Sequence, residues 1–329
     1  RMRIIGPEDL RRALPWQALE DALARIFRDG CAAPLRHRHP LPQPDAPGAG
    51  PEGMLLLMPA WDLPDTPGRR HSGVKIVHVL PGNGALGLPA VHASYLLSDA
   101  ATGAPIALLD GGELTDRRTA AASTLAGRFL ARPDSRRLLV LGSGKVATAL
   151  AEAWAARFPI TEIAIWSRNG DNAARLAAKL AAHGLPARAA ATPDPRGFDI
   201  ISCATLSEAP LVRGAEVAPG THIDLVGAFR PMMRESDSAL IARATLVVDT
   251  RAGALAEAGD IVQPIAEGAI TEAHVAADLA ELCRGAHPGR RRAEEVTVFK
   301  SVGWAGEDLA AAILAAERTE PDTSAPPLS

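Results

Sequence analysis

The sequence is poor in cysteine and aromatic residues, and it has no long apolar run. Of its 329 residues, three are Cys, one is Tyr and six are Phe. Three widely separated cysteines provide neither a disulfide framework nor the clustered ligands of a zinc site. No stretch approaches the roughly 20 apolar residues of a membrane-spanning helix, and Pro7, Glu8 and Asp9 interrupt any apolar signal core near the start. We therefore expect a cytoplasmic protein without a bound metal.

An excess of charge of one sign is also absent. The 35 Lys and Arg residues nearly balance the 38 Asp and Glu residues, which leaves a formal net charge of −3. This balance gives no long-range attraction for nucleic acid or for an anionic membrane, and we expect neither as a partner. Hydrophobic residues make up 47% of the chain, which is long enough for two domains with separate cores.

The first third of the chain predicts a helix followed by several short strands. An apolar stripe between Pro7 and Gly30 predicts one helix. Residues 34–51 are rich in proline and basic side chains, and Gln43 to Pro51 is expected to be poorly ordered. Four later runs, separated by turns with Gly or Pro, predict an antiparallel or mixed sheet. These runs are Met54–Met58, Val74–Leu80, Ala90–Leu97 and Pro105–Leu109.

Beyond Arg118 the pattern changes to alternating strands and helices. Such alternation is typical of a parallel sheet with helices on both faces. The predicted strands are Leu138–Leu141, Glu162–Trp166, Ala187–Ala190, Asp199–Ser202, His222–Val226 and Thr245–Val248. Helices are predicted from Arg118 to Ala131, from the glycine turn to Arg157, from Asp171 to His183 and from Ser301 to Arg318. The proline-containing end, Thr319 to Ser329, is expected to be disordered.

The segment Gly142–Ala147 reads GSGKVA and fits the dinucleotide-binding pattern G-x-G-x-x-A. It follows an apolar strand and opens a helix, which is the context that the pattern requires. The first glycine permits a tight turn, the second lets the backbone approach a pyrophosphate, and the alanine allows close packing of helix and strand. The alternative is an ordinary glycine-containing turn. We assign to cofactor binding Gly142, Ser143, Gly144, Lys145 and Val146.

The end of the second strand of this region indicates which dinucleotide is bound. NAD-binding proteins usually place an acid there for the ribose 2′-hydroxyl. Here the strand is followed by Ser167, Arg168 and Asn169, and the first carboxylate is Asp171. A hydroxyl and a guanidinium suit a 2′-phosphate, so we expect NADPH, with NADH as the alternative. A solvated surface arginine is the other interpretation of Arg168.

Several motifs resemble the ornithine cyclodeaminase/mu-crystallin family, in the right order and from about Ile5 to Leu314. The resemblance implies an α/β protein: a Rossmann domain with a doubly wound parallel sheet, and a discontinuous α+β domain for substrate binding and dimerisation. The corresponding boundaries are 118–299 for the Rossmann domain and 1–117 with 300–329 for the other. A homodimer is implied as well. The motifs are Met58–Ala60, Gly73–Val77, Asp116–Ala121, Gly227–Pro231 and Val298–Gly303.

The resemblance also implies that basic residues hold a substrate carboxylate. The matching positions are Arg36, Lys75 and Arg118, and a guanidinium can bind a carboxylate through two parallel hydrogen bonds. For Arg36 the alternative is a solvated charge in a basic loop. For Lys75 it is a strand residue that faces solvent. Arg117, which neighbours Arg118 at a helix start and points elsewhere, is expected at the surface.

The loop after the fifth Rossmann strand departs from the cyclodeaminases of the family. Those enzymes carry an aspartate there, and the resemblance places Phe229 at its position. Phenylalanine can neither accept a proton nor pair with an ammonium group. The loop, together with Leu80–Asn83 and Gly87–Ala90, resembles the Δ1-pyrroline-2-carboxylate and Δ1-piperideine-2-carboxylate reductases. These enzymes reduce a cyclic imino acid to proline or pipecolate, so such an imino acid is the expected ligand.

In such a reduction a hydride reaches C2 of the imine, and the imine nitrogen carries or receives a proton. Lys75 is the candidate for donating or positioning this proton. His92 is a weaker substrate-site candidate, whose alternative is a structural strand residue, and Asp308 is interpreted as a helix or interface residue. By family position the nicotinamide is expected near Thr119, Val226, Gly227, Ser301 and Gly303, and Ala204 and Thr205 are also assigned to cofactor binding.

Three other functions stay open on the sequence. An ornithine cyclodeaminase would release ammonia from ornithine without net use of NADPH, and it would need an acid to replace Phe229. A mu-crystallin-like protein would bind NADPH and a ligand without turnover. An alanine dehydrogenase-like enzyme would act on an open-chain amino acid and release free ammonia.

Overall fold

The computed structural model describes residues 2–42 and 53–319. The stretches for which disorder was expected, Gln43 to Pro51 and the end beyond Thr319, lie outside the described residues. The chain divides into two compact units, Arg1–Arg118 with Ala305–Ser329, and Thr119–Trp304. Among the described residues, no helix has the length and hydropathy needed to cross a bilayer.

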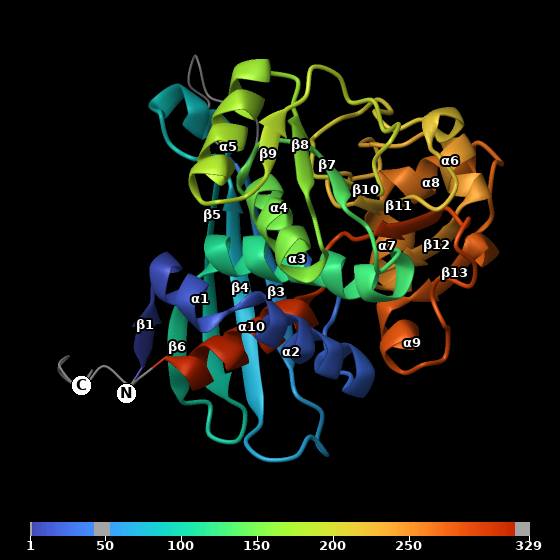
Figure 1. The fold of residues 1–329 in the computed structure, drawn as a ribbon. Helices are drawn as coiled ribbons and strands as arrows, with labels where there is room; N and C mark the ends of the chain where they lie inside the picture. Colours follow the sequence, from blue (N-terminus) through green and yellow to red (C-terminus); the bar gives the residue numbers. More distant parts are fainter. Residues whose placement is uncertain (1, 43–52, 320–329) are drawn as a thin grey trace. The chain divides into compact units, whose positions relative to one another are not determined.

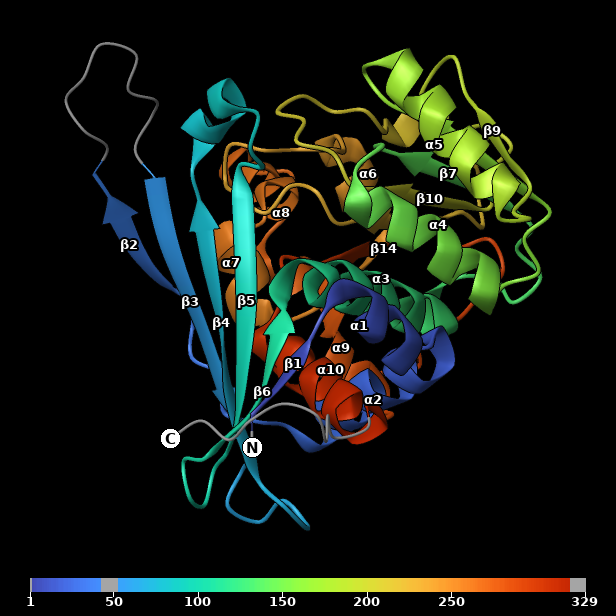
Figure 2. The ribbon, with the colours of Figure 1, turned by 90° about the vertical axis from the view of Figure 1, so that its left-hand side faces the viewer.

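The first unit contains a mixed six-stranded sheet in the order β1-β6-β5-β4-β3-β2. β1 pairs with β6 in parallel, and all other neighbours are antiparallel. Figure 2 shows β2 to β6 side by side. The mixed sheet confirms the expectation, although β1 and β2 were not predicted. The strands are β1 (Arg3–Ile5), β2 (His37–Leu41), β3 (Gly53–Trp61), β4 (His71–Val79), β5 (Val91–Asp99) and β6 (Pro105–Asp110).

Helix α10 (Ala305–Arg318) lies against β3, β4, β5 and β6 of this sheet, and the N-terminal helices α1 (Pro7–Ala13) and α2 (Trp16–Asp29) pack on it. The single helix expected between Pro7 and Gly30 is wrong, because the helix is broken at Leu14 and Pro15. Proline has no N–H to donate within a helix, and it restricts the residue before it. A short 3-10 helix, η1 (Pro81–Leu86), precedes β5.

The second unit contains an all-parallel eight-stranded sheet in the order β13-β12-β14-β11-β10-β7-β8-β9 (Figure 1). The run β9-β8-β7-β10-β11 is the Rossmann order, and the strand order reverses between β7 and β10. The expected α/β fold is therefore confirmed. The strands are β7 (Arg137–Leu141), β8 (Glu162–Trp166), β9 (Ala187–Ala189), β10 (Ile200–Cys203), β11 (His222–Leu225), β12 (Thr245–Val248), β13 (Val275–Asp278) and β14 (Thr297–Lys300).

Every residue of β10, β11 and β14 is buried, as expected for the centre of a parallel sheet covered on both faces. α4 packs on β7, and α5 packs on β8 and β9. The helices are α3 (Gly111–Leu130), in which the boundary between the units falls, then α4 (Lys145–Arg157), α5 (Gly170–Ala182), α6 (Ser238–Arg243), α7 (Arg251–Glu257), α8 (Gly259–Ala266) and α9 (Leu279–Cys283), with the 3-10 helices η2 (Gly214–Glu216) and η3 (Glu272–His274).

The end of the second unit differs from the expectation. β14, which was not predicted, inserts between β11 and β12. The helix expected from Ser301 begins only at Ala305. The backbone N–H groups of Val302 and Gly303 donate to the Asp249 carboxylate instead, and Gly303 adopts a φ of 91°, which is incompatible with a right-handed helix. Residues up to Trp304 therefore belong to the second unit.

Candidate functional site

Two of the predicted carboxylate-binding residues of the first unit lie in one buried ionic cluster. Lys75 Nζ on β4 lies 2.9 Å from Asp308 Oδ2. Arg118 on α3 donates from Nε to Asp308 Oδ1 at 2.9 Å and from Nη1 to Glu307 Oε2 at 2.8 Å. We call Lys75, Arg118, Glu307 and Asp308 the clamp cluster. Its side chains are at most 6% exposed, so Lys75 does not face solvent.

Secondary structure explains why these four side chains meet. Alternation along the strands places Lys75 on the same sheet face as Tyr95, its partner on β5, and this face is the one that α10 covers. Glu307 and Asp308 occupy the first turn of α10, where acids are also favoured by the helix dipole. Thr115, one turn before Arg118 on α3, accepts a hydrogen bond from Lys75 Nζ at 3.2 Å.

The cluster is electrostatically balanced but leaves Lys75 unusually acidic. Burial lowers the pKa of Lys75 to about 8; the Asp308 carboxylate opposes this, while the charges of Arg118 and Arg36 add to it. Asp308 faces two cations, which outweigh its own burial and lower its pKa. The pKa of Arg118 is raised, since its two acids outweigh the large cost of burial. Asp308 is thus ionised, while Lys75 exchanges its proton within the physiological range.

The structure does not gather every predicted residue into this cluster. Arg36 is half-buried before β2, and its charge acts on Lys75. His92 is exposed, and its position on β5 puts it on the sheet face opposite to that of Tyr95 and Lys75. Arg117 is not at the surface as expected: it donates two hydrogen bonds to the Leu14 carbonyl, and its guanidinium stacks 4.0 Å from the Trp16 ring centroid.

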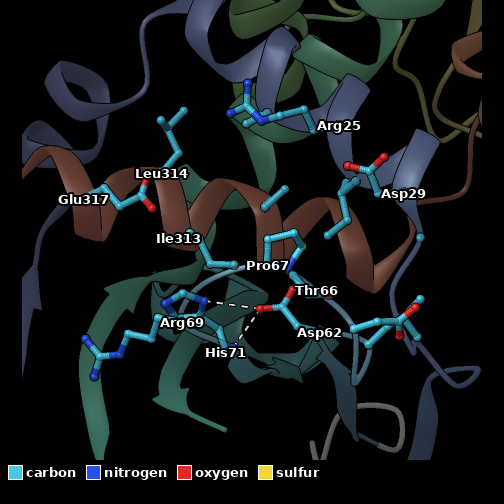
Figure 3. A pocket seen from close by; sticks show the side chains of 16 residues that line it. Arg25, Asp29, Asp62, Thr66, Pro67, Arg69, His71, Ile313, Leu314 and Glu317 are labelled. Carbon is cyan, nitrogen blue, oxygen red and sulfur yellow. Dashed lines mark hydrogen bonds and ion pairs between the residues drawn. The ribbon is translucent and has the colours of Figure 1, made fainter.

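A pocket of about 630 Å³ in this unit lies apart from the predicted residues. It lies between α2, the turn after β3 and α10 (Figure 3). Three of its polar side chains are paired: His71 Nδ1 lies 3.3 Å from Asp62 Oδ2, and Arg69 contacts Asp99 outside the pocket. None of the predicted site residues lines it, so we assign it no role in the chemistry.

The glycine turn of the second unit has the geometry that a dinucleotide requires. Gly142 has a φ of +125°, and a Cβ there would lie 2.5 Å from the Ala204 carbonyl oxygen, so the turns after β7 and β10 touch. A Cβ on Gly144 would meet no heavy atom within 4 Å. Ala147 is fully buried. No side chain caps the N-terminus of α4, whose first turn of backbone N–H groups is the usual partner of a pyrophosphate.

The end of β8 carries the residues predicted for the adenosine ribose. Arg168 is exposed, and Ser167 Oγ donates to the Asn169 carbonyl at 2.6 Å. The Asn169 side chain caps α5 by accepting from the N–H groups of Asp171 and Asn172. Asn169 therefore orders the turn, and Ser167 and Arg168 are the groups that fit a 2′-phosphate.

The remaining predicted cofactor residues, apart from Thr119 on α3, lie in three loops of the second unit that follow β10, β11 and β14. Ala204 and Thr205 follow β10, Val226 and Gly227 follow β11, and Ser301 and Gly303 follow β14. Carboxyl ends of parallel strands share one sheet edge, so these loops meet where α/β proteins bind ligands. Phe229 packs against the hydrophobic core and carries no titratable group.

Glu307 and Asp308 are the residues that the sequence analysis missed. Asp308 was interpreted as a helix or interface residue, and Glu307 was not considered. Two consecutive acids in the first turn of a helix usually stabilise its N-terminus. The available signal was the run of eight apolar residues from Leu309 to Ala316, which predicts a helix buried on most sides and little solvent for either carboxylate.

These features define the class of the protein: an oxidoreductase whose second unit has a Rossmann-like NAD(P)-binding sheet and whose first unit carries the buried cations Lys75 and Arg118. A family model described as the ornithine cyclodeaminase/mu-crystallin family matches residues 41–322. The chain belongs to this family, whose members include NAD(P)H-dependent imine reductases and dehydrogenases.

Individual relatives agree with this assignment. The chain is 41% identical to a Δ1-pyrroline-2-carboxylate reductase of Paracoccus denitrificans, over 88% of this chain and 92% of that protein. It is 35% identical to the ketimine reductase mu-crystallin of Rattus norvegicus, over 90% and 89%.

Two solved structures resemble the whole chain. The Thermococcus litoralis Δ1-pyrroline-2-carboxylate reductase in complex with NADH and L-proline gives a TM-score of 0.87 at 34% identity, over 96% of this chain and 97% of that one. An archaeal alanine dehydrogenase dimer with bound NAD gives 0.85 at 28% identity, over 96% and 95%.

Proposed function

We propose that the protein uses NADPH to reduce the C=N bond of a cyclic 2-imino acid, giving proline from Δ1-pyrroline-2-carboxylate or pipecolate from Δ1-piperideine-2-carboxylate. The observation that carries the proposal is the buried Lys75 held by Asp308 beside Arg118. The named reductases among the relatives support it. When bound, the nicotinamide supplies a hydride for C2 of the imine. The chain binds the cofactor, orients the substrate and supplies the proton for the imine nitrogen.

The residues for the cofactor are those of the glycine turn and the end of β8. Backbone N–H groups of the α4 first turn bind the pyrophosphate, and Ser167 and Arg168 bind the 2′-phosphate. The two similar proteins with solved structures contain NADH and NAD, respectively. The preference for NADPH therefore rests on the Ser167–Arg168 pair and on the missing acid after β8.

The residues for the substrate are Arg36, Arg118 and Lys75. Arg36 and Arg118 hold the carboxylate, which fixes C2 and the nitrogen in one orientation. Lys75, whose pKa lies near 8, is protonated at neutral pH and can release its proton to the imine nitrogen. Protonation makes the C=N carbon more electrophilic. Asp308 keeps Lys75 charged until that step.

Cyclodeamination of ornithine is disfavoured by the loop after β11. The Phe229 side chain can neither accept a proton from an amine nor pair with an ammonium group. The carboxylate that contacts this loop, Glu235, is fully buried and accepts hydrogen bonds from Thr205 and Gly227 through both oxygens. It therefore cannot take the place of a catalytic aspartate.

The direct test is NADPH oxidation with each cyclic imine, for the wild type, Lys75→Ala and the exposed-lysine control Lys179→Ala. We expect activity in the wild type and the control, and a loss of about 100-fold or more in Lys75→Ala, as for removal of a general acid. Ornithine should release no ammonia. Equal rates for wild type and Lys75→Ala, or proline formed from ornithine without NADPH use, would contradict the proposal.

We also propose that the protein is a homodimer, because the similar alanine dehydrogenase is described as one. Light scattering behind size-exclusion chromatography should give twice the mass of 34.3 kDa. A mass of one chain across micromolar concentrations would overturn this proposal.

A further inference from the structure

Buried acids lie beneath the three loops at the carboxyl edge of the parallel sheet. Glu235, Asp249 and Asp260 are each fully buried in the second unit. Buried carboxylates are costly unless they accept several hydrogen bonds or face a cation. None of the three has a part in the proposed binding or proton transfer, so their presence at this edge needs another explanation.

Glu235 joins the loops that follow β10 and β11. Its Oε1 accepts from the Thr205 backbone N–H at 2.6 Å and from Thr205 Oγ1 at 2.8 Å. Its Oε2 accepts from the Gly227 N–H at 2.8 Å. A single carboxylate thus sets the distance between two segments that are adjacent only in the folded sheet.

The fit around Gly227 leaves no room for adjustment. A Cβ on Gly227 would lie 2.0 Å from the Thr205 carbonyl oxygen and 2.3 Å from Glu235 Oε1. Both distances are far below van der Waals contact. The two loops are therefore in direct contact, with the carboxylate closing one side of the junction.

Asp249 does the same for the loop that follows β14. Its Oδ2 accepts from the N–H groups of Val302 at 2.9 Å and Gly303 at 2.8 Å, while Oδ1 accepts from Thr250. These bonds hold the segment between β14 and α10 in its non-helical form.

Asp260 and Lys300 complete the arrangement. Asp260 Oδ1 accepts from the backbone N–H of Glu235 and from Ser236, which fixes the segment that carries Glu235. Lys300 Nζ lies 3.6 Å from Asp260 Oδ2, and both are fully buried. Burial raises the pKa of Glu235 to about 7, the charge of Lys300 opposes this rise, and Asp260 adds to it. Lys300 therefore reduces the effect of burial on Glu235 but does not cancel it.

We infer that Glu235 and Asp249 are positioning residues that shape the part of the dinucleotide site that takes the nicotinamide ring. This inference rests on the proposed binding of NADPH at the loops after β10, β11 and β14. The acids bind Thr205, Gly227, Val302 and Gly303 through their N–H groups, so these four amides do not serve as donors for a ligand. The adenosine and pyrophosphate are expected at the glycine turn and the end of β8. The glycine turn touches Ala204, but the hydrogen bonds of Glu235 go to Thr205 and Gly227.

The test compares two ligands on Glu235→Gln and Asp249→Asn. NADPH carries the nicotinamide, and 2′-phospho-ADP-ribose lacks it but keeps the groups expected at the glycine turn. The new side-chain amide keeps the size of the acid, but its NH2 group is a donor where the acid had an accepting oxygen. The backbone N–H groups of one loop therefore lose the oxygen that accepted their hydrogen bonds. Calorimetric titration gives Kd for both ligands, with the exposed acid Glu272→Gln as the control.

In each acid variant we expect Kd for NADPH to rise about tenfold, the loss expected for one hydrogen bond to a charged group. Kd for 2′-phospho-ADP-ribose should stay within about twofold of the wild type, as should both constants in Glu272→Gln. A general loss of structure would weaken both ligands equally, and that result would overturn the inference.

Each of the remaining outcomes supports or overturns the inference or the proposed function. Unchanged NADPH binding in both acid variants overturns the inference, and so does failure of both to fold, which would make the acids purely structural. A wild type that binds no dinucleotide overturns both the inference and the proposed function. A wild type that binds NADPH but reduces neither imine contradicts only the proposed reaction, and the comparison of ligands still tests the inference.

Discussion

Lys75 Nζ and Asp308 Oδ2 lie 2.9 Å apart, with the lysine 3% and the aspartate 0% exposed. The two residues are 233 positions apart in the sequence. Their pairing makes the protonation state of Lys75 depend on Asp308. Burial lowers the pKa of Lys75 to about 8, and the Asp308 carboxylate limits this lowering.

The first prediction concerns the pH dependence of imine reduction. Lys75 must carry a proton to deliver it, so kcat/KM should fall as pH rises above about 8. Asp308→Asn removes the charge that raises the pKa of Lys75, and the fall should therefore move to lower pH. Profiles of kcat/KM between pH 6 and 10 measure this, and Glu317→Gln, an exposed acid on the same helix, should leave the profile unchanged. A profile that moves to higher pH in Asp308→Asn would remove Lys75 as the proton donor.

The second prediction concerns stability. Arg118 neutralises Glu307 and shares Asp308 with Lys75. Arg118→Met removes the guanidinium that pairs with both Glu307 and Asp308, and breaking a buried ion pair typically costs about 3–5 kcal/mol. Urea denaturation should show this loss, whereas Lys179→Met, an exposed cation on α5, should change the free energy of unfolding by less than about 0.5 kcal/mol. A loss below about 1 kcal/mol for Arg118→Met would show that the two buried acids do not depend on this guanidinium for their stability.

Local sequence patterns were enough to predict the parallel sheet and the glycine turn. β8 and β12 match the predicted strands residue for residue, and the steric roles expected of Gly142, Gly144 and Ala147 agree with their surroundings. These features depend on neighbours within one turn or strand. The break at Pro15 was available from the same kind of signal and was overlooked.

Other features depend on contacts that no local pattern encodes. β14 contains only two apolar residues, Val298 and Phe299, and nothing near Thr297–Lys300 indicates that it inserts between β11 and β12. Arg117 and Arg118 are adjacent and chemically identical, yet one stacks on Trp16 and the other binds acids of α10. Asp308 is likewise an ordinary first-turn acid until the fold brings Lys75 to it. Such long-range partners are decided by tertiary packing.

The third prediction concerns the choice of dinucleotide. If Arg168 binds the 2′-phosphate, Arg168→Ala should raise Kd for NADPH about 10- to 100-fold and leave Kd for NADH nearly unchanged. Ser167→Asp should add an acceptor for the ribose hydroxyl and favour NADH. Fluorescence titration with both nucleotides measures the ratio, and Arg175→Ala on α5 is the matched control. An equal change for both nucleotides in Arg168→Ala would show that this guanidinium does not distinguish them.

The fourth prediction separates two glycines of one turn. Gly142 has a φ of +125° and faces the Ala204 carbonyl, so Gly142→Ala introduces both backbone strain and a clash. Strain of this kind costs about 1–3 kcal/mol, and a lower melting temperature should follow whether or not a ligand is present.

Gly144→Ala should behave in the opposite way. Gly144 has a φ of −83°, which any residue can adopt, and its added methyl group would meet no protein atom within 4 Å. Unfolding free energy should therefore change by less than about 1 kcal/mol. The methyl group would instead occupy the space through which the backbone approaches a pyrophosphate, and Kd for NADPH should rise at least about tenfold. Thermal denaturation and calorimetric titration of the two variants measure both effects. If Gly144→Ala binds NADPH as well as the wild type does, the pyrophosphate does not lie at this turn.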